Sequence, residues 1–429
     1  MRFLSLAKGA AAAGAAMAAA LGGLYLWTRP APLPAAAMPP LPSAAVLAAG
    51  ARVVALGDCM VCHTARDGAP YAGGYGLRTP FGTIYSTNIT PDPDTGIGNW
   101  SPAAFRRALR EGVARDGHLL YPAFPYIHYT RMSDRDIELA YAYLMSRTPV
   151  RAEARRNDLA FPLNFRPMLA FWNALYLRPG DARIPARQAT PLERGRYLVD
   201  TLGHCASCHS GMNPLGGERH PAFQGGNIDG WDAPALTRLA AGAAPWRHGE
   251  LVDYLRGGLS SAHGAAKGPM RPVTERLAGV PREDVEAIAT YLMSIQATGA
   301  AAARPQGQAP DIARVAASVP AGAAGARLFD AACAGCHAAP APMMRLAGRP
   351  GLARSSAVLG ASPVDFVQTV LHGVPWAHGS AVYMPPFADT LSDAQVAQLA
   401  AYIRTGLAGQ PAWKDVATTS ARVRKENEQ

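Results

Sequence analysis

The sequence predicts a mainly α-helical protein of three small tandem domains that follow an apolar N-terminal segment. A five-residue motif, Cys-x-x-Cys-His, occurs three times and uses all six cysteines of the chain. Each copy lies between a short helical pattern and a later amphipathic helical pattern, and such recurrence indicates an internal repeat. The length of 429 residues agrees with this organisation, since roughly 150 residues per domain is the usual prior.

The first helical pattern of each repeat contains a glycine within about ten residues of the motif, at the same place in all three copies. The similar spacing predicts that the first helix and the motif keep one geometry throughout. The glycines and motifs are Gly50 with Cys59-Met60-Val61-Cys62-His63, Gly195 with Cys205-Ala206-Ser207-Cys208-His209, and Gly325 with Cys333-Ala334-Gly335-Cys336-His337.

The closing helix of each repeat is predicted from its apolar spacing, and each one carries a tyrosine. Two of them start with a capping-box pattern, formed by Ser133 with Asp136 and by Ser392 with Gln395. The expected helices and their tyrosines are 136–146 with Tyr143, 284–294 with Tyr291, and 395–404 with Tyr402.

These patterns set the domain boundaries. Pro- and Arg-rich residues separate the first two repeats, and an Ala, Gln and Pro stretch separates the last two, so both segments are expected to be linkers. The predicted parts are an N-terminal segment 1–43, domains 44–150, 190–298 and 318–408, linkers 151–189 and 299–317, and a tail 409–429.

The N-terminal segment predicts export and membrane attachment. Arg2 and Lys8 precede 19 uncharged residues, 9–27, which as a helix would extend roughly 28 Å, close to the thickness of a bilayer core. A cleaved secretory signal is the alternative, with a cleavage site near 35–37, but the run is long for one. We favour a retained anchor, with the positive residues inside and the domains on the periplasmic face of the inner membrane. The Pro-rich residues 28–43 predict a stiff extended spacer.

The motif predicts covalent haem. Two thiols on one helical turn can each bond a vinyl group of a haem, and the histidine that follows can then bind the iron as proximal ligand. A zinc site built from two Cys pairs, a thioredoxin-like redox pair and three disulfides are the competing interpretations. None of them explains a histidine after every second cysteine. We therefore expect three covalently bound haem c groups in three class I cytochrome c-like domains, held by Cys59, Cys62, Cys205, Cys208, Cys333 and Cys336, with His63, His209 and His337 on the irons.

A methionine opposite the histidine raises the reduction potential and closes the iron to other ligands, which suits electron transfer. In the third repeat Met384 stands before two prolines, and in the second Met270 follows Gly-Pro. The methionine ligand of the first repeat is harder to assign, because Phe124 occupies the place that corresponds to Met384. Met132 is the preferred ligand there and His128 the alternative.

The net charge of +10 does not indicate nucleic-acid binding. The propionates of three haems, partly offset by the ferric cores, would lower it to about +7, and the chain has no basic run with interleaved aromatic residues.

At these motifs the chain resembles the three-haem cytochrome c subunits of membrane-bound bacterial dehydrogenases. The resemblance covers nearly everything after residue 44, and its most specific string is Thr79-Pro80-Phe81-Gly82-Thr83-Ile84-Tyr85-Ser86-Thr87-Asn88-Ile89-Thr90-Pro91-Asp92, continued by Thr95-Gly96-Ile97-Gly98-Asn99-Trp100. Ser261-Ala262-His263-Gly264, Gly268-Pro269-Met270 and Tyr383-Met384-Pro385-Pro386-Phe387 extend it to the other repeats. Many members have Ala-Met-Pro-Tyr where this chain has Ala123-Phe124-Pro125-Tyr126.

The resemblance implies an electron-transfer subunit, without a catalytic site of its own, that passes electrons from a dehydrogenase catalytic subunit to quinone, another cytochrome or a terminal oxidase. Three classes of partner are possible: molybdenum hydroxylases of aldehydes or N-heterocycles, quinoprotein alcohol dehydrogenases, and flavin-dependent sugar or sugar-acid dehydrogenases. The strings 27–35 and 410–413 favour the first. A haem peroxidase with an open iron in the first domain and a free-standing electron shuttle are the other hypotheses.

Overall fold

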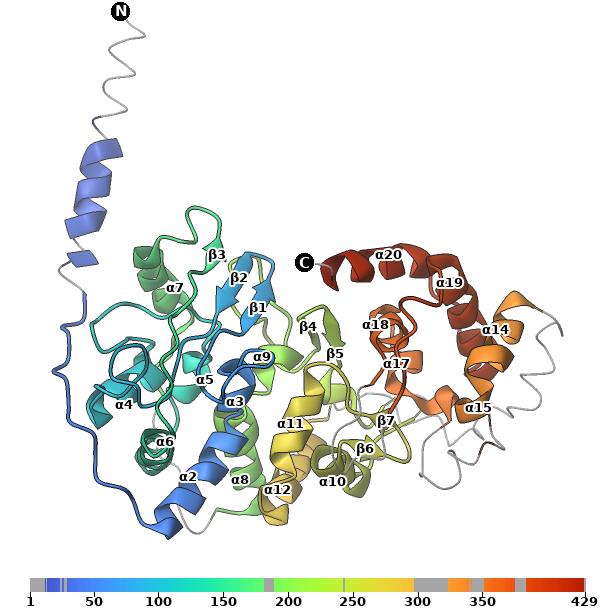
Figure 1. Ribbon diagram of the computed structural model, residues 1–429, viewed down its shortest axis with the longest axis horizontal. Helices are drawn as coiled ribbons and strands as arrows, with labels where there is room; N and C mark the ends of the chain where they lie inside the picture. The colour runs from blue at the N-terminus through green and yellow to red at the C-terminus, as the bar shows by residue number, and fades with distance from the viewer. Residues whose placement is uncertain are drawn as a thin grey trace, which may run out of the picture. The chain divides into compact units, whose positions relative to one another are not determined.

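The computed structural model describes residues 12, 14–23, 25–26, 29–180, 189–241, 244–296, 323–338, 341, 351–374 and 383–427. Its contacts divide the chain into two units, Met1–Ile184 and Pro185–Gln429. Helices dominate both units and the sheets are small, as the sequence predicts (Figure 1).

In the first unit, serines begin the three longest helices by accepting a backbone N–H with the side chain, as Ser43, Ser101 and Ser133 do. Ser133 therefore starts the closing helix of the repeat where the capping pattern places it. The helices are α2 (Ala44–Leu56), α3 (Cys59–Cys62), α4 (Pro102–Glu111), α5 (Tyr126–Tyr129), α6 (Asp134–Met145), the 3₁₀ turn η1 (Arg166–Met168) and α7 (Leu169–Tyr176).

A small antiparallel sheet, in the order β1-β2-β3, follows the first motif. Its strands are β1 (Gly76–Thr79), β2 (Gly82–Tyr85) and β3 (Asp158–Leu159). β3 belongs to the predicted linker 151–189, so the start of that segment pairs with the first repeat.

The first part of the second unit repeats the helix–motif–helix arrangement. Its opening helix begins at a capping box between Thr190 and Glu193, and a π-helical turn leads into the second motif. The elements are α8 (Pro191–Tyr197), η2 (Leu198–Leu202), α9 (Ala206–His209), β4 (Gly226–Ile228), β5 (Trp231–Ala233), η3 (Leu236–Arg238), α10 (His248–Gly257), β6 (Leu259–Ser260), β7 (Gly264–Ala265), α11 (Met270–Leu277) and α12 (Arg282–Ser294).

The second part of this unit contains the third motif. Ser392 and Gln395 form the predicted capping box, and the tail adds a helix that packs on its neighbours (Figure 1). The elements are α14 (Ala324–Ala332), α15 (Ala334–His337), η4 (Leu352–Arg354), α17 (Ser356–Leu359), α18 (Val364–His372), α19 (Asp393–Ala401), the π-helical turn η5 (Tyr402–Leu407) and α20 (Val416–Asn427).

One helix crossing recurs three times within the described residues. The opening helix packs against the closing one in the pairs α2 with α6, α8 with α12, and α14 with α19. At each crossing the glycine lies against the backbone carbonyl of the partner helix, and a Cβ atom built on it would also lie 2.7, 2.9 and 2.8 Å from the Cβ atoms of Tyr143, Tyr291 and Tyr402. The three glycines and three tyrosines singled out by their spacing are therefore the two sides of one close contact, which only glycine permits.

The Pro-rich spacer is extended, as predicted, but it lies along the first unit. Leu33 donates its backbone N–H to Arg115 O at 2.8 Å, and Ala36 donates to Asn99 O at 3.1 Å. The Arg107 guanidinium donates to Ala31 O at 2.6 Å. The reason is that an extended chain leaves its backbone N–H and C=O groups unpaired. The segments on either side of α4 supply carbonyl acceptors for two N–H groups of the spacer, and Arg107 of α4 supplies a donor for one carbonyl.

The expected membrane anchor lies partly outside the described residues. Residues 14–23 are helical. Among the residues that the structure describes, no helix has the length and apolar character needed to cross a membrane.

The glycine contact gives a stability prediction. Replacing Gly195 with Ala should lower the free energy of unfolding by about 1–3 kcal/mol, because the added methyl group meets the Ala287 carbonyl and forces the two helices apart. Thermal unfolding followed by circular dichroism measures the effect.

The matched control is Gly249→Ala, in α10 of the same unit, where no atom lies within 4 Å of the added Cβ. This variant should be neutral or more stable, by up to ~1 kcal/mol, because alanine favours a helix over glycine. Equal stability of the two variants would contradict the prediction.

Candidate haem-binding sites

Each motif folds as a single helical turn. The backbone N–H of the motif histidine donates to the carbonyl of the first cysteine, at 3.0 Å for His63, 2.9 Å for His209 and 2.9 Å for His337. The turn gathers both cysteines and the histidine of each motif within five residues. All six cysteines are described and none of them forms a disulfide.

The first motif histidine is oriented by a backbone carbonyl. His63 Nδ1 donates to Thr87 O at 2.6 Å, which leaves Nε2 as the nitrogen with a free lone pair. Burial lowers the pKa of His63, and the hydrogen bond to Thr87 only partly opposes this effect. The imidazole is therefore neutral at neutral pH, with Nε2 in the state that a metal requires.

The second motif repeats this arrangement. His209 Nδ1 donates to Pro234 O at 2.7 Å, and burial again lowers the pKa of the imidazole against the effect of that bond. In the third repeat, residues 342–350 of the loop after His337 lie outside the described residues. Both sites that can be compared hold the histidine as a neutral ligand with one fixed ring orientation, which fits a proximal haem ligand.

Two of the predicted methionine ligands lie in segments that contacts with neighbouring residues hold in place. Met270 is the first residue of α11, two residues after Gly268, which has a φ of +49° and lies against the indole of Trp231. Met384 is paired with Val374 by two backbone hydrogen bonds, both 2.9 Å. Both methionines are half-buried, as the motif histidines are.

The first repeat differs. Met132 is 3% exposed and His128 is 7% exposed, so both are buried in protein. Met132 directly precedes the cap Ser133, and its carbonyl accepts a hydrogen bond from Arg110 at 2.6 Å. Phe124 is half-buried and packs against the Tyr126 and Tyr129 rings. The sixth ligand of this repeat stays a prediction.

Comparison with known proteins agrees with this geometry. A family model described as "Cytochrome c" matches residues 192–296, and one described as "Cytochrome C oxidase, cbb3-type, subunit III" matches 320–403. The gluconate 2-dehydrogenase cytochrome c subunit of Pantoea cypripedii is 37% identical over 378 residues, which cover 84% of this chain and 85% of the relative. The cytochrome c subunit of the quinone alcohol dehydrogenase of Gluconobacter oxydans is 35% identical over 384 residues, with 84% and 78% covered. The chain belongs to the family of dehydrogenase cytochrome c subunits.

A further relative, from the nicotinate dehydrogenase of Pseudomonas putida, is 47% identical over 386 residues. The alignment covers 89% of this cytochrome c subunit but only 32% of that relative's length. The resemblance seen in the motifs is thus confirmed, and with it haem c as the kind of cofactor and electron transfer as the activity.

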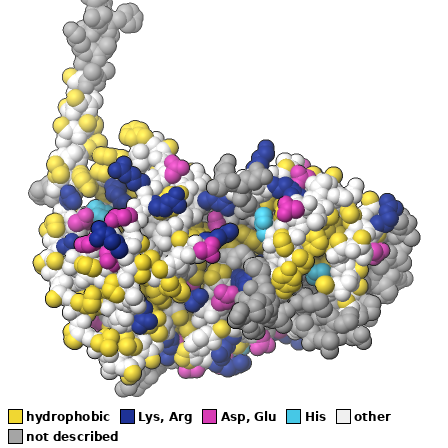
Figure 2. All heavy atoms as spheres, in the orientation of Figure 1, with side chains coloured by type: hydrophobic (Ala, Val, Ile, Leu, Met, Phe, Trp, Pro, Cys, Tyr) yellow, Lys and Arg dark blue, Asp and Glu magenta, His cyan; other side chains and the backbone are white. Residues whose placement is uncertain are grey.

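The surface charge of the cytochrome subunit is mixed. On the face shown in Figure 2, Lys and Arg are interspersed with Asp and Glu. Ion pairs occur in both units, such as Arg110 with Asp134 at 2.8 Å in the first and Arg194 with Asp284 at 2.9 Å in the second.

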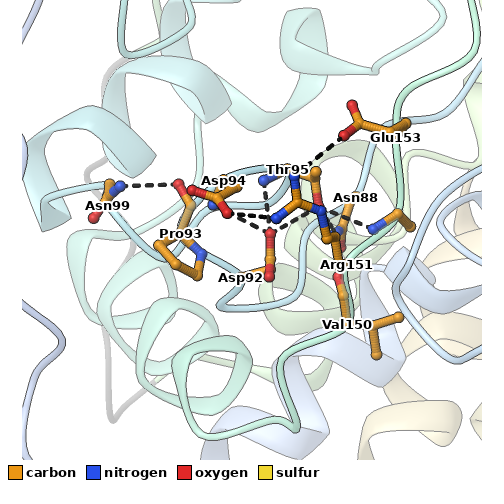
Figure 3. Close-up of polar contacts among 10 residues, drawn as sticks. Asn88, Asp92, Pro93, Asp94, Thr95, Asn99, Val150, Arg151 and Glu153 are labelled. Carbon is orange, nitrogen blue, oxygen red and sulfur yellow. Dashed lines mark hydrogen bonds and ion pairs between the residues drawn. The ribbon is translucent and has the colours of Figure 1, made fainter.

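The family-specific string of the first repeat holds the carbonyl that orients His63. Asn88, the residue after Thr87, is 3% exposed and donates through Nδ2 to Val150 O at 2.7 Å and to Thr95 Oγ1 at 3.0 Å. Its Oδ1 accepts from the Thr90 backbone N–H at 2.9 Å. One buried amide therefore joins the Thr87 loop to the segment that follows α6 (Figure 3).

A second layer of contacts closes the same loop. The Asp92 carboxylate accepts from the N–H and hydroxyl of Thr95, at 2.7 and 2.8 Å, and these bonds hold the pKa of Asp92 below its usual value. Arg151 pairs with Asp94 at 2.8 Å, and Asn99 donates to Pro93 O at 2.9 Å (Figure 3). The polar residues of the string thus stabilise the loop that presents Thr87 O to the haem site.

The acceptor carbonyls of Thr87 and Pro234 are functional groups that the motifs did not reveal. A backbone carbonyl has no residue type, so only the surrounding turn residues could have indicated it. For Thr87 that signal is the Thr-Asn-Ile-Thr string itself, and for Pro234 it is the Asp229-Gly230 turn of the hairpin that precedes it.

Asn88 gives the site prediction. Asn88→Ala should cost about 1–3 kcal/mol of stability, because it leaves buried polar partners unsatisfied. The variant also removes the contacts that hold the loop around Thr87, whose carbonyl orients His63. The reduction potential of the haem at the first motif should therefore change, while the other haems keep theirs. A spectroelectrochemical titration measures the potentials and thermal unfolding the stability.

Asn99→Ala is the control, since the side-chain hydrogen bond that it removes, to Pro93 O, is exposed and the backbone bond from Ala36 is kept. It should leave both properties unchanged. An Asn88→Ala protein with all potentials at wild-type values would show that the string does not tune the His63 site.

Proposed function

We propose that this cytochrome subunit carries three covalently bound haem c groups, one in each helix–motif–helix repeat. The main support is the glycine–tyrosine helix crossing, which recurs with its motif in all three. The cysteine pairs 59 and 62, 205 and 208, and 333 and 336 would hold the haems, and His63, His209 and His337 would bind the irons. When bound, the haems supply one-electron oxidation and reduction.

The chain's own residues set the conditions for this chemistry. His63 and His209 each present a neutral Nε2, and the carbonyl partner of each fixes the plane of the imidazole. Met270 and Met384 are proposed as the opposite ligands, on loops braced by Trp231 and Val374. For the first haem we propose Met132, with His128 as the alternative. Both side chains are buried, and His128 as the ligand would give a lower potential than Met132.

The proposed role is to accept electrons from a dehydrogenase catalytic subunit and to deliver them to quinone, another cytochrome or a terminal oxidase. We favour a molybdenum hydroxylase of aldehydes or N-heterocycles as the partner. The relative at 47% identity is named for nicotinate, which is an N-heterocycle, and supports this choice. Quinoprotein alcohol dehydrogenases and flavin-dependent gluconate or sugar dehydrogenases are the alternatives, supported by relatives at 35% and 37% identity, respectively.

We also propose attachment to the inner membrane, facing the periplasm. Besides the N-terminal run, large apolar side chains are exposed in and before α7. Tyr25 of the N-terminal segment packs on the same small cluster as Leu169 of α7, so the two apolar elements are continuous within the first unit. The exposed side chains are Phe161, Leu163, Phe165, Met168, Phe171 and Leu175.

The functional prediction concerns the isolated complex. The chain should co-purify with a molybdopterin-containing subunit, and an N-heterocycle or aldehyde substrate should reduce all three of its haems. Haem quantified as the pyridine complex should be three per chain, and haem stain should stay with the chain on a reducing denaturing gel, because thioethers are not reduced.

A Cys205→Ser, Cys208→Ser double variant is the control, and it should lose one haem in three. Pyrroloquinoline quinone or flavin in the co-purified subunit would instead identify the partner as a quinoprotein dehydrogenase or a flavin-dependent dehydrogenase. Loss of all haem stain under reducing conditions would contradict covalent attachment, and turnover of hydrogen peroxide would favour the peroxidase alternative.

The localisation prediction is that the chain stays in the membrane pellet through high-salt and alkaline washes and is released by detergent. N-terminal sequencing should then begin near Met1. A soluble periplasmic chain that begins near residue 38 would instead establish cleavage after 35–37.

A further inference from the structure

Hydrogen bonds join the second and third repeats inside the second unit. The Asp365 carboxylate, on α18, accepts the backbone N–H of Asp232, on β5, at 2.9 Å. The Gln368 side chain, one turn further along α18, donates to Gly230 O at the tip of the β4–β5 hairpin at 3.1 Å. Gln368 is 4% exposed, so its amide lies in the contact and not in solvent. These two bonds are called the interlock below.

The β4–β5 hairpin holds the Asp232 N–H and the Gly230 carbonyl of the interlock in a fixed geometry. Asp229 and Gly230 have φ angles of 51° and 76° and form a two-residue turn between paired Ile228 and Trp231. Such a turn matches the natural twist of two strands and is rigid. A side chain at Gly230 would come within 3.2 Å of the Gln368 amide nitrogen, so the turn fits α18 closely.

The same hairpin contacts both ligand-bearing parts of the second candidate haem site, the histidine and the methionine segment. Pro234, directly after β5, accepts the hydrogen bond that orients His209. Trp231 lies against Gly268 in the loop that leads to Met270. The element that meets the third repeat is therefore the one that supports the proximal histidine and the methionine loop of the second.

On the other side, α18 supports the methionine loop of the third repeat. After the helix ends at His372, Gly373 adopts a φ of +67° and Val374 forms its two bonds to Met384. Phe387 and Ala388 then donate to the carbonyls of Val370 and Leu371 at 3.0 and 3.1 Å. The backbone that carries Met384 is thus fixed to the C-terminal turn of α18.

A charge adds to the contact. Lys267, three residues before Met270, lies near Asp365. Burial lowers the pKa of Lys267 to about 8, and the Asp365 carboxylate opposes that shift. The ammonium of the second repeat and the carboxylate of the third therefore attract each other where the two methionine loops are tied together.

We propose that Asp365 and Gln368 are positioning residues that hold the Met384 loop of the third repeat in a fixed geometry to the His209 and Met270 loops of the second, and so set the rate of electron transfer between these two sites. The proposal rests on the proposed function, since it needs a haem in each repeat. The transfer moves one electron from the haem that is reduced to the haem that is oxidised, and no covalent bond changes. Electron transfer weakens steeply with separation, so a docked pair transfers faster than two domains joined only by the linker between them.

The test compares Asp365→Ala with Asp365→Asn in the full-length holo-protein. Asparagine keeps an oxygen that accepts the Asp232 N–H, whereas alanine removes it. Hydrogen exchange of the hairpin peptide 226–234, measured by mass spectrometry, reports the interlock without any turnover. Transfer between the second and third haems is measured after rapid one-electron reduction. Asp253→Ala, an exposed acidic residue of α10, is the surface control.

We expect about tenfold faster exchange of the hairpin in Asp365→Ala, as for the loss of one hydrogen bond to a charged group, and a similar fall in the transfer rate. Asp253→Ala should match the wild type in both measurements. Asp365→Asn keeps the acceptor but loses the charge that attracts Lys267, so it should lie between the wild type and Asp365→Ala. Gln368→Met, which keeps the volume but removes the donor, should behave like Asp365→Ala and serves if that variant does not fold.

Wild-type exchange and transfer in both Asp365→Ala and Gln368→Met would overturn the proposal, as would equal losses in Asp365→Asn and Asp365→Ala. Haem content separates this failure from failure of the proposed function. A wild-type chain without a haem in the second or third repeat contradicts the function, whereas three haems with an unchanged transfer rate contradict only the interlock.

Discussion

The hydrogen bond from a motif histidine to a distant backbone carbonyl is the interaction on which the first two candidate haem sites depend. It spans 24 residues for His63 and 25 for His209. To place one carbonyl oxygen within 2.7 Å of an imidazole, the chain must fold the whole intervening loop reproducibly. The first repeat does so with a buried asparagine and a network of short polar side chains, and the second does so with a two-residue hairpin. In both repeats the acceptor residue comes just after an antiparallel hairpin, β1–β2 before Thr87 and β4–β5 before Pro234. The two sites therefore share one arrangement and differ in the side chains that support it.

The recurring parts of the fold could be predicted because their constraints act over short distances in sequence. A glycine one helix before the motif and a tyrosine in the closing helix identified the crossing, since close helix packing leaves no room for a Cβ. Ser133 and Ser392 began the closing helices as their capping patterns predict. Cysteine spacing gave the haem chemistry for a similar reason, because both thiols and the histidine must share one turn.

The parts that could not be predicted depend on contacts between distant segments. Nothing in the sequence of 28–43 shows that α4 and Arg115 will bind it, so the spacer was expected to stand free. Met132 illustrates the same limit. Its place before a helix cap fits both a packing residue and a ligand, and its burial follows from the neighbours that fold around it. The interlock could not be predicted either. The sequence identifies Asp365 and Gln368 only as residues of an amphipathic helix and does not show that the hairpin of another repeat contacts them.

The third repeat shows how the tail can replace a missing loop. It is the shortest of the three from motif histidine to closing tyrosine, and α20 packs against α18 and α19. Val423 is fully buried in the core of α18 and α19, and Arg424 donates to Asp393 at 2.8 Å and to the carbonyls of Ala388 and Leu391. Those carbonyls lie in the segment that runs from Met384 to the closing helix. Because α18 holds the start of this segment and α20 holds its end, the backbone around Met384 is fixed from both sides. The C-terminal tail is therefore part of the support of the third site, and a truncation before Val416 would release the same loop that the interlock positions.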